Sequence, residues 1–248
     1  MTPLAIDLFC GLGGWTEGLL AEGWDVIGFD IERHEYGEHR YPAQLVVQDV
    51  LTLHGSQFKG ADLIVASPPC QAYSYRAMPW KRAKALPPPD NMLFEACFRI
   101  QREASAAKGA HIPMVVENVR GAQPWVGRAK WNFGSFYLWG DVPALMPPIT
   151  KGAQKFNPDG TSHGQGSWFA IADSKNRGAH KLPGFRFDGS GRSFQSASVK
   201  GAVGSWFYGN ETGARYHNSK SSARKFASAM IARIPEPLSR HIGRVFKP

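Results

Sequence analysis

Short apolar runs alternate with helical patterns over the first 150 residues of the chain. Residues 15–22 and 93–107 carry apolar positions at the spacing of an amphipathic helix. Five mainly apolar runs have the length of buried strands, and they lie at residues 4–9, 25–30, 44–50, 62–66 and 113–117. Because strands that alternate with helices form βαβ units, we predict an α/β fold with a doubly wound, Rossmann-like and mostly parallel sheet.

The pattern changes after residue 150. Residues 151–221 hold 12 glycines among polar and scattered aromatic residues, which is typical of a small β-rich module or an ordered loop system. A helical pattern returns over residues 222–245 and is interrupted by the two prolines of residues 234–237. We therefore predict three parts: a first domain of residues 1–150, a small Gly-rich module of residues 151–221, and a helical segment of residues 222–248 that returns to the first domain.

Charge separates the same parts. The net charge of the chain is +9, and it divides into −2 for residues 1–150 and +11 for residues 151–248. A strongly basic segment joined to a nearly neutral one predicts a polyanionic partner such as nucleic acid. The alternative is a basic surface that is simply solvated.

Composition excludes several classes of protein. No apolar run approaches the roughly 20 residues of a membrane span, and the first residues lack a signal-peptide pattern. The three cysteines cannot all pair, and none has the C-x-x-C spacing of a zinc or redox site. We expect a soluble, cytoplasmic protein with no membrane contact and no metal, and a monomer by default.

A glycine-rich turn, FCGLGG at residues 9–14, follows the first strand and opens the first helix. Such a turn brings a ligand close to the backbone at a helix N-terminus. Thr16 occupies the position of the third glycine in a dinucleotide fingerprint, which disfavours NAD and FAD. Asp30 and Asp49 end the next two strands, where they are placed to accept hydrogen bonds from ribose hydroxyls and an adenine amino group. Each aspartate, taken singly, has the alternative role of a turn or helix cap.

A candidate nucleophile follows the fourth strand. Two prolines stiffen the sequence SPPCQ at residues 67–71 and present Cys70 at the carboxyl edge of the sheet, where ligands bind in this architecture. Cysteine is nucleophilic as the thiolate, so the setting of this thiol matters. Cys97, among apolar residues on a helix, is predicted to lie in the core, and Cys10 is predicted to be a small packing residue.

A candidate acid follows the fifth strand. Glu117 ends an apolar run, and neighbouring parallel strands would bring it to the same rim as Cys70. Its alternative role is a helix cap. A thiol and a carboxyl of raised pKa suit the chemistry of cytosine carbon 5, which becomes nucleophilic when a thiolate adds to carbon 6 and an acid engages ring N3.

With these motifs the chain resembles the cytosine-5 DNA methyltransferase family. The matching pieces are DLFCGLGG at residues 7–14, PPCQ at residues 68–71 and ENV at residues 117–119, in the family's order and spacing. Residues 234–243 are similar to the family's last motif, which returns to the cofactor site. The resemblance covers about the first 140 residues and this tail, and implies S-adenosylmethionine (AdoMet) as cofactor and duplex DNA with a flipped-out base as partner.

The resemblance also implies roles for individual residues. Cys70 is the nucleophile and Glu117 engages the cytosine, while residues 72–90 form a mobile loop that closes over the base. The implied cofactor-binding residues are Asp7, Phe9, Gly11, Gly13, Gly14, Asp30, Ile31, Asp49 and Pro69. The implied nucleic-acid contacts are Gln71, Ser74, Arg76, Lys81, Arg82 and Arg186.

The sequence departs from the family pattern in two places. A Gln-x-Arg-x-Arg run normally precedes the strand that corresponds to residues 137–140, but this chain has GSF there. We expect Arg128 to supply the missing catalytic pocket arginine, with Lys130 or Arg186 as alternatives. The region available for target recognition is also short, at 71 residues, which predicts that only a few base pairs are read.

Three other functions remain open at this stage. A cytosine-5 tRNA methyltransferase would carry nearly the same motifs, and a non-catalytic relative would keep the fold to bind nucleic acid. An NAD-dependent oxidoreductase is the third alternative. A stand-alone modifier of a bacterial or phage-infected cell, acting beside a restriction enzyme or without one, suits the small basic module best.

Overall fold

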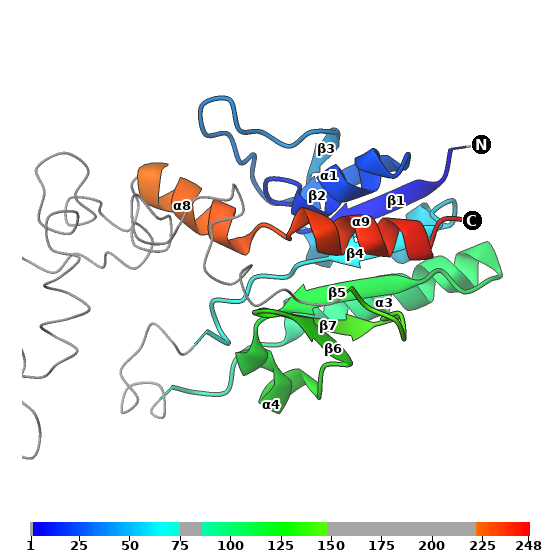
Figure 1. Cartoon of the computed structure of the whole chain (residues 1–248). Helices are drawn as coiled ribbons and strands as arrows, with labels where there is room; N and C mark the ends of the chain where they lie inside the picture. The colour runs from blue at the N-terminus through cyan, green and yellow to red at the C-terminus, as the bar shows by residue number, and fades with distance from the viewer. Residues whose placement is uncertain (1, 75–85, 148–221) are drawn as a thin grey trace, which may run out of the picture. The chain divides into compact units, whose positions relative to one another are not determined.

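The computed structural model describes residues 2–74, 86–147 and 222–248 (Figure 1). The chain divides into two compact units, one of Met1–Ala153 with Arg233–Pro248 and one of Gln154–Ala232. The described part of the second unit is helix α8 (Ser222–Ala232). The predicted Gly-rich module of residues 151–221 lies outside the described residues, so the predicted domain boundaries stay predictions.

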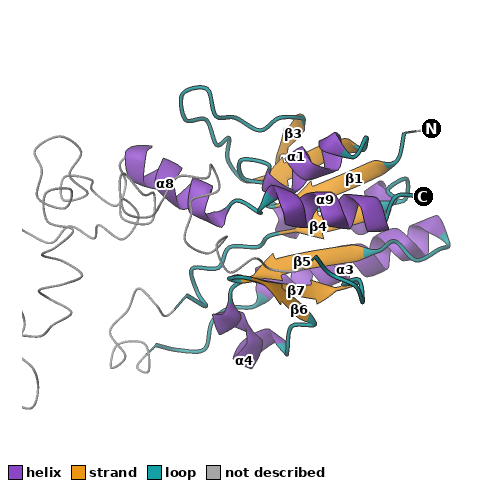
Figure 2. Cartoon of the chain, viewed as in Figure 1, coloured by secondary structure: helices purple, strands orange, loops and turns teal. Residues whose placement is uncertain are grey.

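Seven strands of the described chain form one mixed sheet in the order β3-β2-β1-β4-β5-β7-β6 (Figures 1 and 2). The parallel strands are β1 (Leu4–Leu8), β2 (Asp25–Asp30), β3 (Gln44–Val47), β4 (Leu63–Ala66) and β5 (Met114–Asn118). Strand order reverses between β1 and β4, which is the switch point where parallel sheets form their ligand crevice. The predicted α/β fold class is confirmed.

The third strand is shorter than the sequence predicted. It ends at Val47 rather than residue 50, because Asp49 caps the 3₁₀ turn η1 (Val50–Thr52). The Asp49 carboxylate accepts a hydrogen bond from the Leu51 amide at 2.9 Å. Such an Asx turn offers the backbone an alternative to the sheet ladder.

An antiparallel hairpin closes one edge of the sheet. Strands β6 (Trp131–Phe133) and β7 (Phe136–Gly140) are joined by a two-residue turn, and Gly134 in this turn has a φ of 61°. A positive φ at the first turn position alone is typical of a type II′ hairpin. The sequence pattern indicated the run at 137–140 but not its partner strand β6.

Helices cover both faces of the sheet, as its continuous apolar runs require. On one face, Ile6, Ile64 and Val116 pack with helix α3 (Met92–Lys108). On the other face, their neighbours Ala5, Val65 and Val115 pack with helices α1 (Gly14–Ala21) and α9 (Glu236–Val245). Successive strand residues point to opposite faces, so each strand contributes to both cores.

The C-terminal helix α9 lies beside α1 (Figure 1). The Trp24 indole donates a hydrogen bond to the Gly243 carbonyl at 2.9 Å. The helices approach so closely at Gly18 that a Cβ there would lie 2.5 Å from the Cβ of Ser239. Helix α9 therefore completes the helical layer on this face of the sheet and packs against the helix that follows the glycine-rich turn.

Candidate active site

The glycine-rich turn follows β1 in a left-handed backbone conformation. Phe9, Gly11 and Gly13 have φ values of 58°, 52° and 82°, and Phe9 is the one non-glycine residue with positive φ in the described chain. Such a conformation costs a side chain about 1 kcal/mol or more, and it is often retained at ligand sites. The Gly11 amide donates to the Asp30 carboxylate at 2.9 Å, which ties the turn to the end of β2.

Asp30 lies at the carboxyl end of β2 and is 8% exposed. Burial raises the pKa of its carboxyl, but hydrogen bonds from His34 and the Gly11 amide outweigh it, so the pKa lies below the usual value. The side chain is therefore an ionised acceptor held in a fixed orientation. Ile31, next along the chain, is 69% exposed, and the half-buried Asp49 follows the neighbouring strand β3.

Asp7 lies on β1 beneath the turn and is completely buried. One carboxyl oxygen accepts a hydrogen bond from the Thr16 hydroxyl at 2.6 Å, and the same hydroxyl lies 2.6 Å from the Tyr41 hydroxyl. The other oxygen, Oδ1, has no partner among the described residues. Burial raises the pKa of Asp7 to about 7. Thr16, noted in the sequence only as a missing glycine, is thus a polar support of this buried carboxyl.

Tyr41 comes from the loop between β2 and β3, and no sequence signal marked it. It is buried, and a Cβ on Gly28 would lie 2.4 Å from its hydroxyl oxygen. A glycine in the middle of β2 therefore makes room for this ring. A contact of this kind depends on two segments whose proximity only the folded sheet creates.

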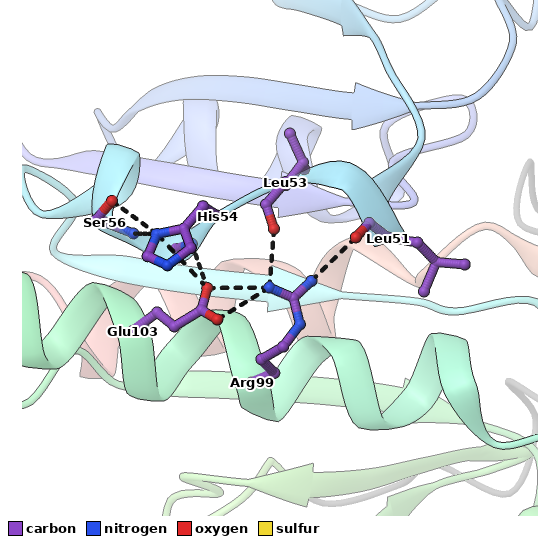
Figure 3. Close-up of polar contacts among 7 residues, drawn as sticks. Leu51, Leu53, His54, Ser56, Arg99 and Glu103 are labelled. Atoms are coloured by element: carbon purple, nitrogen blue, oxygen red, sulfur yellow. Dashed lines mark hydrogen bonds and ion pairs between the residues drawn. The ribbon is translucent and has the colours of Figure 1, made fainter.

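A polar cluster fixes the loop that follows Asp49 (Figure 3). From helix α3, the Arg99 guanidinium donates to the Leu53 carbonyl at 2.9 Å and to the Leu51 carbonyl at 3.4 Å. Glu103, one turn further on, pairs with Arg99 at 3.0 Å and accepts a hydrogen bond from the Gly55 amide at 2.6 Å. Two charged side chains of α3 therefore hold the loop that follows Asp49, the predicted adenine contact.

The predicted nucleophile lies in a loop pinned to the next strand. Cys70 is half-buried, and its carbonyl accepts hydrogen bonds from the amides of Tyr73 and Ser74 at 3.0 Å. The Asn118 side chain donates to the Pro68 carbonyl at 2.9 Å. Asn118 was part of the predicted ENV motif, and its contact explains why an amide follows the acid: it anchors the loop that carries the thiol.

Glu117 stands beside this loop at the rim. Because Ala66 of β4 pairs with Val116 of β5, Ser67 and Glu117 are the next residues on neighbouring strands. Burial raises the pKa of Glu117 to about 8, and a hydrogen bond with the Ser67 side chain partly offsets this. Burial, and next the charge of Glu117, raise the pKa of the Cys70 thiol to about 11. Near neutral pH the pair is therefore a thiol and a largely protonated carboxyl.

The other predicted site residues are distributed unevenly. Pro69 and Gln71 are exposed and Ser74 is half-buried on the nucleophile loop, while Arg128 is exposed between α4 (Gln123–Val126) and β6. The predicted contacts that lie outside the described residues are Arg76, Lys81, Arg82 and Arg186. Cys10 and Cys97 are buried, as predicted for packing residues.

Two classes of feature are absent from the described residues. Residues 2–74, 86–147 and 222–248 contain no group of three or more His, Cys, Asp or Glu side chains placed to hold a metal ion. Within the same ranges, no helix combines the length and the apolar character needed to cross a membrane.

Comparison with known proteins finds similarity to one protein family over about half of the chain. The sequence profile of the C-5 cytosine-specific DNA methylase family matches residues 4–123. No curated protein sequence matches the chain.

Solved structures of methyltransferases are similar to parts or all of the chain. A structure described as a DNA modification methyltransferase encoded within an E. coli prophage is 28% identical, with a TM-score of 0.35, over 49% of this chain and 33% of that one. The S. pombe Dnmt2 methyltransferase is 16% identical, with a TM-score of 0.34, over 50% and 36%. The Entamoeba histolytica methyltransferase EhMeth is 12% identical, with a TM-score of 0.47, over 99% and 98%. The chain thus spans about a third of the length of the first two.

Proposed function

We propose, from the match of residues 4–123 to the C-5 cytosine-specific DNA methylase family, that this protein transfers a methyl group from AdoMet to carbon 5 of cytosine in duplex DNA. The observation that carries the proposal is the position of Cys70 and Glu117 on neighbouring strand ends. The glycine-rich turn at the adjacent end of β1 supports it, because the indole of Trp15 donates to Ser67 at 3.0 Å and so joins the two loops.

The thiol and the carboxyl divide the chemistry between them. The Cys70 thiolate forms a bond to carbon 6 of cytosine while the Glu117 carboxyl gives its proton, or a hydrogen bond, to ring N3. This makes carbon 5 a nucleophilic enamine carbon, which would form a bond to the methyl group as the bond from that group to the AdoMet sulfur breaks, leaving S-adenosylhomocysteine. A base then takes the carbon 5 proton, the bond from carbon 6 to sulfur breaks to release the thiolate, and N3 returns its proton to Glu117, which regenerates the aromatic ring and the enzyme. A carboxyl with a pKa of about 8 suits this role, because it keeps its proton at neutral pH.

The protonated state of Glu117 also assists Cys70. A charged Glu117 opposes ionisation of the thiol, so a neutral carboxyl removes that repulsion when the thiolate must form. The electrostatics therefore favour one order of events. Glu117 keeps its proton while the Cys70 thiolate forms, and gives the proton to cytosine N3 only when the thiolate adds to carbon 6.

The residues around the turn fit AdoMet, which when bound supplies a methyl group on a positively charged sulfur. Asp7 Oδ1 is a buried acceptor without a partner, which suits an ammonium group of the methionine part. The ionised Asp30 has acceptor capacity beyond its present hydrogen bonds and suits the ribose hydroxyls. A Cβ on Gly11 would meet nothing within 4 Å, so this side of the turn is open to a ligand.

Cytosine must leave the base stack to reach this pair. Carbon 6 of a stacked base is inaccessible to a half-buried thiol at the rim of a sheet, so the target nucleotide is expected to flip out of the duplex. The cost of unstacking is a few kcal/mol, which phosphate contacts elsewhere on the protein offset.

The decisive experiment is transfer of radiolabelled methyl from AdoMet to duplex DNA and, in parallel, to tRNA. We expect label on DNA cytosine, and a loss of at least about a thousandfold in the Cys70→Ala variant. Cys97→Ala, which removes a buried thiol on α3, is the matched control and should retain activity. Label on DNA that persists in Cys70→Ala would refute the covalent mechanism, and label on tRNA alone would assign the RNA substrate instead.

A further inference from the structure

A positively charged stretch follows the ENV motif. Between Glu117 and Asp141 the chain has three cations, Arg120, Arg128 and Lys130, and no acidic residue. All three are exposed. The stretch runs through the 3₁₀ turn η4 (Arg120–Ala122), helix α4 and the start of β6. We call the three cations the rim cations.

The rim cations are held on a folded scaffold. The Gln123 side chain donates to the Arg120 carbonyl at 3.5 Å and accepts from the Ala129 amide at 3.2 Å, so the stretch turns back on itself. The Trp139 indole then donates to the Gly127 carbonyl at 2.9 Å. Arg120 and Arg128 therefore come from neighbouring points of one compact turn, although eight residues separate them in the sequence.

This scaffold borders the candidate active site. The Lys130 amide donates to the Leu138 carbonyl at 2.9 Å, and Leu138 pairs across the sheet with Glu117. A second connection runs through Asn91, which accepts from the Tyr73 hydroxyl at 2.9 Å and donates to the Trp125 carbonyl at 3.2 Å. The turn is thus joined to both the strand that carries Glu117 and the loop that carries Cys70.

We propose that the rim cations contact backbone phosphates of the DNA that flank the flipped-out cytosine. The inference rests on the proposed function and extends it by assigning a substrate-binding surface. Exposed guanidinium and ammonium groups without acidic neighbours in sequence attract phosphate. The exposed indole of Trp125, 39% exposed on the same turn, adds the flat apolar surface common at nucleic-acid contacts. A fixed scaffold limits the entropy that these side chains lose on binding.

Salt-dependent DNA binding tests the assignment. The probe is a fluorescent 30-base-pair duplex, and the variants are Arg120→Gln, Arg128→Gln, Lys130→Gln and their triple combination. Each single change should reduce the slope of log affinity against log salt by about 1, and the triple change should weaken binding about tenfold or more at physiological salt. Lys59→Gln changes an exposed lysine that precedes the amino end of β4, whereas the active-site loops follow the carboxyl ends of the strands; it is the matched control and should leave the slope unchanged.

Further measurements distinguish phosphate contact from misfolding and from a role of Arg128 as the pocket arginine. Thermal unfolding and AdoMet affinity of the triple variant should match the wild type, which excludes misfolding as the cause. If Arg128 is instead the pocket arginine, Arg128→Gln lowers kcat and leaves the DNA affinity and the salt slope unchanged, which overturns its assignment as a phosphate contact. An unchanged slope in the triple variant overturns the whole proposal, whereas absence of methyl transfer to DNA by the wild type overturns the proposed function.

Discussion

The indole Nε1 of Trp15 donates a hydrogen bond to the Ser67 hydroxyl at 3.0 Å. Trp15 belongs to the helix that opens at the glycine-rich turn, and Ser67 opens the loop of the nucleophile. The Ser67 side chain also contacts Glu117 and lowers its pKa. One hydroxyl therefore connects the predicted cofactor loop after β1, the thiol loop after β4 and the acid on β5.

The Ser67→Ala change is expected to move the pH dependence of methyl transfer. Activity needs a thiolate and a protonated Glu117, so kcat/KM in the wild type should rise by about tenfold per pH unit and level off near pH 8, where Glu117 begins to ionise. Without the Ser67 hydrogen bond the pKa of Glu117 increases, and the plateau should begin at a higher pH. A profile that is flat from pH 6 to about pH 9 in both proteins would contradict this coupling.

The Glu117→Gln change is expected to remove a pH-dependent loss of stability. Burial raises the pKa of Glu117 from 4.5 to about 8, so between these values the folded state binds more protons than the unfolded state. The free energy of unfolding should therefore fall as pH rises through this window, by an amount on the order of a few kcal/mol. Urea denaturation measures this: the free energy of unfolding should differ less between pH 5 and pH 9 in the variant than in the wild type.

Asp7 adds to the same fall of the free energy of unfolding with rising pH, because its pKa is raised to about 7. The slope that remains in Glu117→Gln should therefore decrease further in the Asp7→Asn, Glu117→Gln double variant. If the single and double variants keep the full wild-type pH dependence, other groups cause it.

The Asp7→Asn change is expected to weaken cofactor binding and alter its pH dependence. A cationic partner binds the ionised carboxylate, so affinity of the wild type for S-adenosylhomocysteine should fall below pH 7, by up to about tenfold per pH unit. The variant should bind more weakly at pH 8 and lose this dependence. Calorimetric titration measures the affinity and its pH dependence. The control is Asp25→Asn, which changes an exposed carboxylate at the amino end of β2. Equal pH dependence in the two variants would exclude Asp7 as the partner.

The Arg99→Met change is expected to weaken cofactor binding from a distance. It leaves the carbonyls of Leu51 and Leu53 without their charged donor, so the loop that follows Asp49 loses its fixed position. We expect a several-fold rise in the Kd for S-adenosylhomocysteine.

A lysine of the same helix provides the control for this prediction. Lys108 donates to the Ala61 carbonyl at 2.6 Å, at the end of α3 remote from Asp49. Lys108→Met should lower the melting temperature without changing the Kd. If both variants weaken binding equally, Arg99 contributes to general stability rather than to the cofactor loop.

The sequence by itself determined the local features of this protein. The strands β1, β4 and β5 are mainly apolar rather than alternating because both of their faces are covered, and that pattern is visible residue by residue. The glycine-rich turn was predictable because only short-range backbone geometry decides it. The candidate thiol and acid were found for the same reason, since each directly follows a predictable strand.

Only the tertiary structure decided which distant residues support these features. Tyr41 under the turn and Arg99 behind the loop of Asp49 carry no local signal, because their contacts join segments that are 25 and 46 residues apart. The partner strand β6 and the packing of α9 on α1 likewise depend on which surfaces remain uncovered once the parallel strands have assembled. The raised pKa values of Asp7 and Glu117 follow from the same burial, which no property of an isolated carboxyl specifies.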